Sequence, residues 1–187
     1  LKPGNTQSWR TDKTISLPID KFSWLKHPIL PFQEQDISSV SRVDSLNWQI
    51  TRSAGGDFQL IDIPKDRALQ YDSILNSVVS NLTNLNFELL LAANEDFAQS
   101  LKVLTQLEVI TADQSTFQVI VSEFDDKHFV NFSSKDHSAY WQKWYYQVSN
   151  FAAQQLIKTR DDFLAEENST TSNSEISPPA MDEGDSP

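Results

Sequence analysis

The chain of 187 residues has no cysteine, four glycines, one methionine and three histidines. Without cysteine it can form neither a disulfide framework nor a thiolate nucleophile nor a Cys-type zinc site. So few glycines cannot build a phosphate-binding loop, and no serine stands in a G-x-S-x-G motif. His27, His128 and His137 lack the i, i+4 spacing that a helical metal-binding pair requires. We therefore predict no catalytic residue, no metal site and no cofactor.

Long hydrophobic runs are also missing. The longest candidate, LNFELLLAA, is interrupted by Glu88, whereas a membrane-spanning helix needs about 20 apolar residues. The sequence opens at Leu1, with neither a methionine nor a signal-peptide pattern. We expect any targeting segment or membrane anchor of the full-length protein to lie outside this sequence.

The net charge of −11 is unevenly distributed. From Asp161 onward there are eight acidic residues and no Lys or Arg, which leaves 18 acids and 15 bases in residues 1–160, a net charge of −3. Nucleic-acid binding requires clustered cations that displace phosphate counterions. This composition therefore predicts that the protein does not bind nucleic acid.

Three runs in the first half alternate apolar and polar residues with a period of two, which is typical of half-buried strands. They are DISSVSRV (36–43), NWQITR (47–52) and DFQLIDI (57–63). The segments between them have turn composition, and Gly55 and Gly56 can adopt positive φ without steric cost. This pattern predicts an antiparallel meander.

The period then changes to that of a helix between residues 71 and 85. The apolar stripe comprises Tyr71, Ile74, Leu75, Val78, Val79, Leu82 and Leu85. A second, short helix is predicted after Asn94, which is a suitable N-cap followed by two acids in the first turn. The long helix is expected to cover one face of the sheet.

The second half repeats this order. QLEVITA (106–112), STFQVIVSEF (115–124) and HFVNF (128–132) read as strands, and a helical rhythm returns over residues 150–166. The adjacent Asp125 and Asp126 indicate a turn, because neighbouring carboxylates point apart and cannot form a catalytic pair. The predicted fold class is α+β, with antiparallel β-meanders each followed by a packing helix, in the order βββα-βββ(β)α.

Four regions follow from these assignments. Residues 1–35 form an extended lead-in with a short helix, 36–93 the first βββα unit, 94–167 the second βββ(β)α unit, and 168–187 an acidic tail. The tail has only Ile176 and Met181 as sizeable apolar side chains. Because such a segment cannot bury enough surface to offset its ordering entropy, it is predicted to be disordered.

The segment YWQKWYYQVSNF (140–151) has six aromatic residues in twelve positions. If it is extended, Trp144 and Tyr146 share one face; if it is helical, Trp141, Trp144 and Tyr145 lie on one stripe. We expect Tyr146, Val148 and Phe151 in the core and the tryptophans nearer the rim, because Trp tolerates a wet edge. The candidate binding residues are Trp141, Trp144 and Tyr145.

Three segments, residues 7–43, 48–69 and 144–166, carry a family resemblance. The matching positions are Trp24, Leu25, Ile37, Val40, Trp48, Phe58, Leu75 to Leu85, Tyr146, Val148, Phe151, Asp162 and Phe163. With them the chain resembles the bacterial family known as domain of unknown function 4340, from about Gln7 to Glu167. The matching positions are structural, so the resemblance implies no active-site residue.

The resemblance implies the second half of a longer chain that is anchored in a membrane and works beside an ABC-type transporter or a gliding-motility-like assembly. We therefore expect a non-enzymatic accessory or scaffold domain, periplasmic or extracytoplasmic, whose partner is a protein such as an ABC-type permease complex. Contact with the membrane is expected only through the missing anchor. The alternative is a ligand-binding module that stacks a sugar or a peptide on exposed aromatic residues.

Overall fold

The computed structural model describes residues 28–30, 32–135 and 140–166. Most of the predicted lead-in and the whole predicted acidic tail lie outside this range. The strands are β1 (Ile37–Arg42), β2 (Trp48–Arg52), β3 (Phe58–Leu60), β4 (Leu89–Ala92), β5 (Lys102–Thr111), β6 (Thr116–Phe124), β7 (Lys127–Ser134) and β8 (Trp144–Val148). The α-helices are α1 (Ile74–Thr83), α2 (Glu95–Ser100) and α3 (Asn150–Leu156), and short 3-10 turns cover Glu34–Asp36, Tyr140–Lys143 and Asp161–Phe163.

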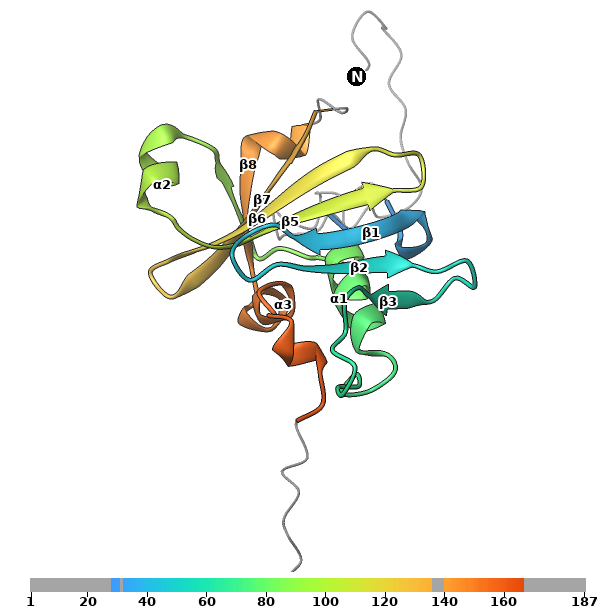
Figure 1. Cartoon of the computed structure of the whole chain (residues 1–187). Helices are drawn as coiled ribbons and strands as arrows, with labels where there is room; N and C mark the ends of the chain where they lie inside the picture. The colour runs from blue at the N-terminus through green and yellow to red at the C-terminus, as the bar shows by residue number, and fades with distance from the viewer. Residues whose placement is uncertain (1–27, 31, 136–139, 167–187) are drawn as a thin grey trace, which may run out of the picture.

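The eight strands of the described residues belong to one curved sheet, in the order β3-β2-β1-β5-β6-β7-β8-β4 (Figure 1). Every neighbouring pair is antiparallel. The predicted α+β class with antiparallel strands is therefore confirmed. Two pairings join segments that are distant in sequence: β1 with β5, and β4 with β8. β3 and β4 form the two edges of the sheet.

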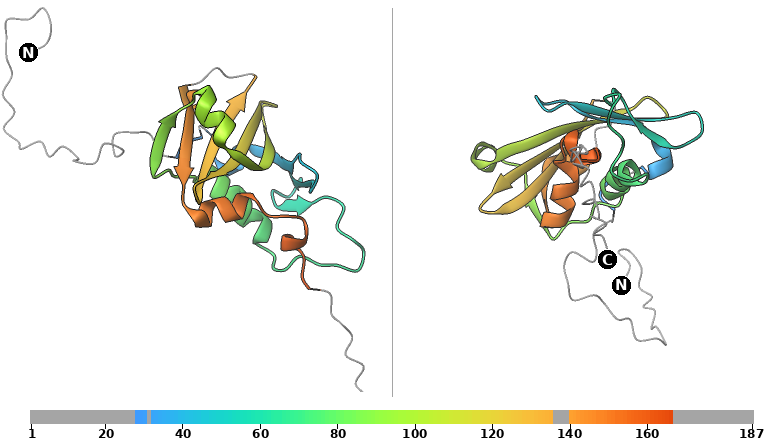
Figure 2. Two further views of the ribbon diagram at one scale, coloured as in Figure 1. Left: turned by 90° about the vertical axis from the view of Figure 1, so that its left-hand side faces the viewer. Right: turned by 60° about the horizontal axis from the view of Figure 1, so that its bottom comes forward.

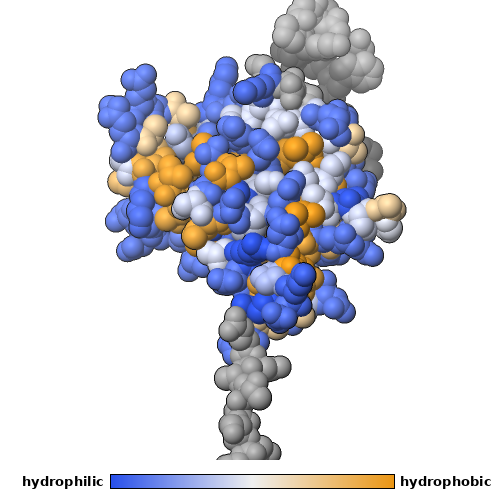
Figure 3. Space-filling view, in the orientation of Figure 1, coloured by the Kyte–Doolittle hydropathy of each residue, from blue (hydrophilic) through white to orange (hydrophobic). Residues whose placement is uncertain are grey.

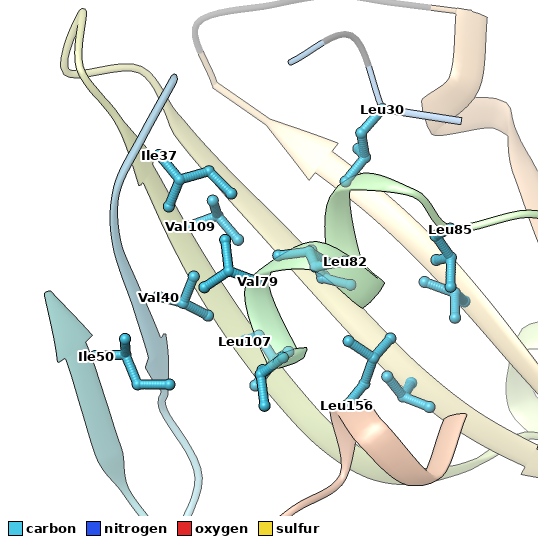
Figure 4. Packing of buried hydrophobic residues seen from close by; sticks show 14 of the residues in the cluster. Leu30, Ile37, Val40, Ile50, Val79, Leu82, Leu85, Leu107, Val109 and Leu156 are labelled. Carbon is cyan, nitrogen blue, oxygen red and sulfur yellow. The ribbon is translucent and has the colours of Figure 1, made fainter. Parts of the chain in front are cut away.

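The helices lie on two different faces of the sheet. α1 and α3 pack side by side against one face, called here the inner face (Figure 2). α2 lies against the opposite face, called the outer face, over β7 and β8. Figure 4 shows the inner packing, in which side chains of the two helices point toward those of the strands. The fully buried members include Val79 and Leu82 of α1, Leu156 of α3, and Val40, Ile50, Leu107 and Val109 of the sheet.

The helices are shorter than their sequence pattern predicts. α1 begins at Ile74, so Tyr71 precedes it and is 47% exposed rather than part of the buried stripe. α3 ends at Leu156 instead of continuing to residue 166. The chain then makes a 3-10 turn that brings Phe163 into the core, where its ring meets the Trp48 indole edge-to-face at 5.1 Å. Burial of this ring, rather than the helical period, decides the path of the last described residues.

The hairpin turns follow from residues that tolerate positive φ. Gly56 has φ 95° in the turn between β2 and β3, as its lack of a side chain predicts. Asp125 and Asp126 have φ 51° and 57° in the two-residue turn between β6 and β7, and two such residues are characteristic of a type I′ hairpin. The two acids are therefore turn residues, as predicted.

A buried arginine joins the sheet to the end of α3. Arg42 is only 5% exposed. Its Nε donates to both carboxylate oxygens of Asp44, at 2.8 and 2.7 Å, and its Nη1 donates to the carbonyls of Ile157 and Lys158 at 2.6 and 2.9 Å. These carbonyls end α3, where a positive charge is favourable. The indole N–H of Trp48 also donates to the Lys158 carbonyl, at 2.8 Å.

Substitution of Arg42 tests how much these hydrogen bonds contribute to the stability of the fold. Arg42→Ala removes the guanidinium from Asp44 and from the Lys158 carbonyl, which keep other donors, and takes away the donor of the Ile157 carbonyl. We expect a loss of about 3–5 kcal/mol in the free energy of unfolding measured with urea, because the partners of a buried charge are left without it. The matched control is Lys102→Ala, which removes an exposed ion pair with Glu123 at 3.5 Å and should cost less than about 1 kcal/mol. Equal losses in the two variants would contradict the proposed role of Arg42.

The carboxylate of Asp44 is held in its charged form. Burial alone raises its pKa, but the N–H of Leu46, the Arg42 guanidinium and the Thr105 hydroxyl donate to it, and together they hold the pKa of Asp44 below its usual value. A depressed pKa in the folded state stabilises the protein at neutral pH. That stabilisation disappears as the pH falls from the unfolded value, near 4, through the lower folded value.

Unfolding of wild type and Asp44→Asn should therefore be compared from pH 7 to pH 2. We expect the variant to be less stable at pH 7 and the difference to shrink steadily below about pH 4, because the wild-type carboxylate is then protonated as well. A difference that is independent of pH would show that the charge on Asp44 does not contribute.

The side of α1 that packs against the sheet provides a further test of the core packing. Val78 is completely buried, so Val78→Asp places an unpaired charge in the core and should prevent folding or abolish the cooperative thermal transition. Asn76→Asp is the matched control, since Asn76 is exposed on the same helix and should melt like the wild type.

Candidate functional site

The outer face of the sheet carries its own aromatic cluster, separate from the main core. Phe129 in β7 is 3% exposed. Its side chain points to the outer face, because the side chain of the next residue, Val130, lies in the inner core and successive residues of a strand point to opposite faces. The Phe97 ring of α2 covers it at 5.2 Å. The same Phe97 ring contacts Tyr145 at 5.4 Å and Phe124 at 5.7 Å. We call these four side chains, Phe97, Phe124, Phe129 and Tyr145, the outer aromatic cluster.

The start of α2 determines the position of Phe97. The side-chain oxygen of Asn94 accepts a hydrogen bond from the Phe97 backbone N–H at 2.8 Å, which caps the helix as the sequence predicts. All three Phe97 contacts are close to edge-on, with interplanar angles of 77° to 82°. Such pairs contribute about 0.5–1.5 kcal/mol each beyond their buried area. The cluster therefore holds α2 against the sheet.

The strand register brings the remaining residues of this surface together. Across the outer face, Val103 of β5 lies beside Ser122 of β6, and Ser122 lies beside Phe129. Ser122 is buried, but Val103 is 61% exposed and Phe124 is 43% exposed. Figure 3 shows hydrophobic side chains gathered on this side of the molecule, over α2 and the neighbouring strand ends. The cluster thus has a buried centre and an exposed apolar rim.

Charged residues surround the apolar rim, and most of them are acidic. The acids are Glu88, Glu95, Asp96, Asp125 and Asp126, and the base is Lys127. The ion pair of Lys102 with Glu123 lies on the opposite face, because these residues alternate along their strands with Val103 and Ser122. The surface therefore carries a net negative charge around an apolar centre.

Two of the three predicted binding residues, Trp144 and Tyr145, lie on opposite faces of the sheet. Tyr145 belongs to the outer aromatic cluster. Trp144, its neighbour in β8, lies on the inner face and packs half-buried against the core, because successive residues of a strand point to opposite faces. The side chain of Trp141 lies outside the described part of the structure. The structure thus brings Tyr145 together with Phe97 and separates it from Trp144.

The rest of the aromatic segment agrees with prediction at two positions of three. Tyr146 and Val148 are both 3% exposed, and the Tyr146 ring meets Phe87 and Phe132. The predicted burial of Phe151 is wrong, since this residue is 68% exposed. The strand ends at Val148 and the Ser149 hydroxyl caps α3, so the buried positions follow the helical spacing of Ala153 and Leu156 instead.

A small cleft of about 260 Å³ lies near Trp48, away from the outer aromatic cluster, and Asn47, Gln49, Asp62 and Arg160 are among the residues that line it. The Nε of Arg160 is buried and has no hydrogen-bond partner in the described part of the chain. No group of three His, Asp or Glu side chains among the described residues could hold a metal ion. None of the helices described here is long and apolar enough to span a bilayer.

Comparison with known proteins finds no matching family model, no matching curated protein and no matching solved structure. The resemblance to domain of unknown function 4340 therefore stays a prediction. Function must be inferred from the surface of the molecule itself.

Two phenylalanines of the cluster should differ sharply in their effect on stability. Phe129→Ala removes a buried ring and should cost about 3–5 kcal/mol of unfolding free energy. Phe124→Ala should cost about 1 kcal/mol or less, because its ring is 43% exposed. Urea titration of both variants measures this difference, and a large loss in Phe124→Ala would mean that the rim belongs to the core.

Proposed function

We propose that this chain is a non-enzymatic accessory or scaffold domain that binds a protein partner through the rim of the outer aromatic cluster. The observation that carries the proposal is the exposure of Val103 and Phe124, by 61% and 43%, at the edge of a buried aromatic centre. Exposed apolar groups rimmed by charged residues mark contact sites on soluble proteins. Aromatic residues at the centre with a polar rim are typical of protein interfaces.

The wider setting of the proposal comes from the family resemblance. It assigns the domain to an extracytoplasmic, membrane-tethered assembly linked to an ABC-type transporter or to gliding-motility-like machinery, with a permease complex as the partner. At the level of the fold, we propose that β1–β3 with α1 and β5–β8 with α3 are corresponding meander-plus-helix units. The side-by-side packing of α1 and α3 on the inner face supports this correspondence.

The second candidate function is a ligand-binding module for a sugar or a peptide. The cleft beside Trp48 is the observation in its favour, because it combines an aromatic edge with Asn47, Gln49 and Asp62. These are hydrogen-bonding groups suited to a polar ligand. Titration of the protein with mono- and oligosaccharides, followed by Trp fluorescence, tests this candidate independently of the outer aromatic cluster.

The leading proposal is tested with the full-length, membrane-tethered protein, purified from detergent-solubilised membranes with quantification of the co-purifying permease. Phe124→Asp should reduce recovery of the permease at least about tenfold, a loss of roughly 1.4 kcal/mol, because the charge must be desolvated at the interface. Phe151→Asp is the matched control, since Phe151 is 68% exposed on α3, and it should recover the permease like the wild type.

Both variants are first compared with the wild type by thermal melting, which should be nearly unchanged because both positions are exposed. Undiminished recovery with Phe124→Asp would contradict the proposed contact surface. Absence of a permease from the wild-type preparation would contradict the link to a transporter.

A further inference from the structure

The edge strand β4 has an unusual composition for its position. It is the last strand of the sheet and pairs only with β8 among the residues that the structure describes. Its sequence, Leu89 to Ala92, is LLLA, with no charge and no proline. Natural edge strands normally carry charged residues or proline, because an open apolar edge attracts another strand.

The register shows which backbone groups point away from β8. The N–H of Ala93 donates to the Lys143 carbonyl at 2.9 Å, and Leu91 lies opposite Tyr145. Because backbone groups alternate between the two sides of an antiparallel strand, the N–H and C=O groups of Leu90 and Ala92 face the open edge. The side-chain amide of Asn94 reaches the Ala92 carbonyl at 3.5 Å. The N–H groups of Leu90 and Ala92 and the Leu90 carbonyl are available to an added strand.

The opposite edge of the sheet is built differently. β3 has three residues, Phe58 to Leu60, and acids flank it at Asp57 and Asp62. Asp62 has φ 60°, so the extended conformation ends two residues after the strand, once Ile61 has donated its N–H to the Gln49 carbonyl. A short edge that turns away is a common protection against strand addition. The two edges therefore differ in their capacity to accept a partner.

The charge around β4 indicates the chemistry of its occupant. Glu88 is exposed at one end of the strand. Glu95 and Asp96 are exposed at the other end, where they outnumber Lys143, which lies beside Ala93. A second copy of this chain would bring the same acids against one another, and the chain has a net charge of −11. A segment with Lys or Arg at its ends would instead find opposite charges at both ends.

We propose that β4 accepts an extended segment of a partner protein as a ninth strand, with apolar residues at alternate positions and Lys or Arg at its ends. This proposal rests on the proposed function, since it names the way in which the protein partner binds. Main-chain hydrogen bonds would come from Leu90 and Ala92, in the manner of other strand-addition complexes.

Both faces of β4 offer apolar contacts to such a segment. On the outer face, Leu89 and Leu91 continue the surface of the cluster that contains Tyr145, which lies opposite Leu91. On the inner face, Ala92 lies opposite the half-buried Trp144. Because the alanine side chain is small, the indole is within reach of residues on an added strand. The contact role that the sequence predicts for Trp144 would then arise at this edge, and not on a surface shared with Tyr145.

The test uses a synthetic peptide, acetyl-KKVTVTVKK-amide, titrated into the ¹⁵N-labelled full chain. We expect the Leu90 and Ala92 amides to shift and to become protected from hydrogen exchange by at least about tenfold at saturation. A peptide with Glu in place of every Lys should bind at least about tenfold more weakly, because it meets the acids around β4.

Two variants at one position separate strand addition from other binding. Ala92→Pro removes the outward N–H without breaking a bond to β8 and should weaken peptide binding at least about tenfold. Ala92→Val keeps this N–H and should bind like the wild type. Equal binding by both variants, or no protection of Leu90, would overturn strand addition, as would self-association of the chain through this edge in analytical ultracentrifugation.

These experiments distinguish failure of strand addition from failure of the proposed function. Loss of permease recovery in Phe124→Asp together with full binding by Ala92→Pro would support the contact surface and refute the ninth strand. The reverse result, with binding that depends on Ala92 and not on Phe124, would place the partner on the edge alone. No binding of the peptide by the wild type up to about 1 mM would refute strand addition, whatever the permease experiment shows.

Discussion

The guanidinium of Arg42 holds the early and late parts of the described chain together. Arg42 ends β1, yet its donors reach the Asp44 carboxylate and the carbonyls at the end of α3. A buried charge is tolerated only when its hydrogen-bonding groups are satisfied. Here that requirement fixes the end of α3 above the centre of the sheet. The 3-10 turn that buries Phe163 against Trp48 follows this point in the chain. This part of the inner face therefore depends on the hydrogen bonds that Arg42 and the Trp48 indole donate to the end of α3.

The sequence pattern predicts the inner half of the molecule well. The period of two in residues 48–52 and the period of 3.6 in α1 report directly on one apolar face. In β1 an irregularity between Ile37 and Ser39 brings Ile37 and Val40 into the same core, although a period of two places them on opposite faces. The continuous run LLLA of β4 has no period, because an edge strand between the core and the outer cluster is apolar on both sides. Phe151 shows a related failure. Its predicted burial continues a strand face into the first turn of a helix, where the spacing of buried positions changes.

The candidate site could not be predicted from the sequence to the same extent. Phe97, Phe124 and Tyr145 come from three elements whose contact depends on sheet order and register. The local signals were present, namely the cap at Asn94 and the tight turn at Asp125–Asp126. They determine how a helix starts and how a hairpin closes, but not that both meet on the same face. The pairing of β4 with β8 supplies that information, and no local pattern encodes it.

This pairing also affects how the protein emerges from the ribosome. β4 and α2 are synthesised about fifty residues before β8 (Leu89 lies opposite Gln147), so their partner strand does not yet exist when they leave the exit tunnel. Contacts between distant segments form slowly, because a long loop must close first. Until Tyr145 arrives, the leucines of β4 and the ring of Phe97 have no β8 to pack against. Nascent-chain intermediates of this kind expose apolar strands and are prone to aggregate. The acids around β4 give neighbouring nascent chains the same charge, and this repulsion disfavours their pairing during that interval.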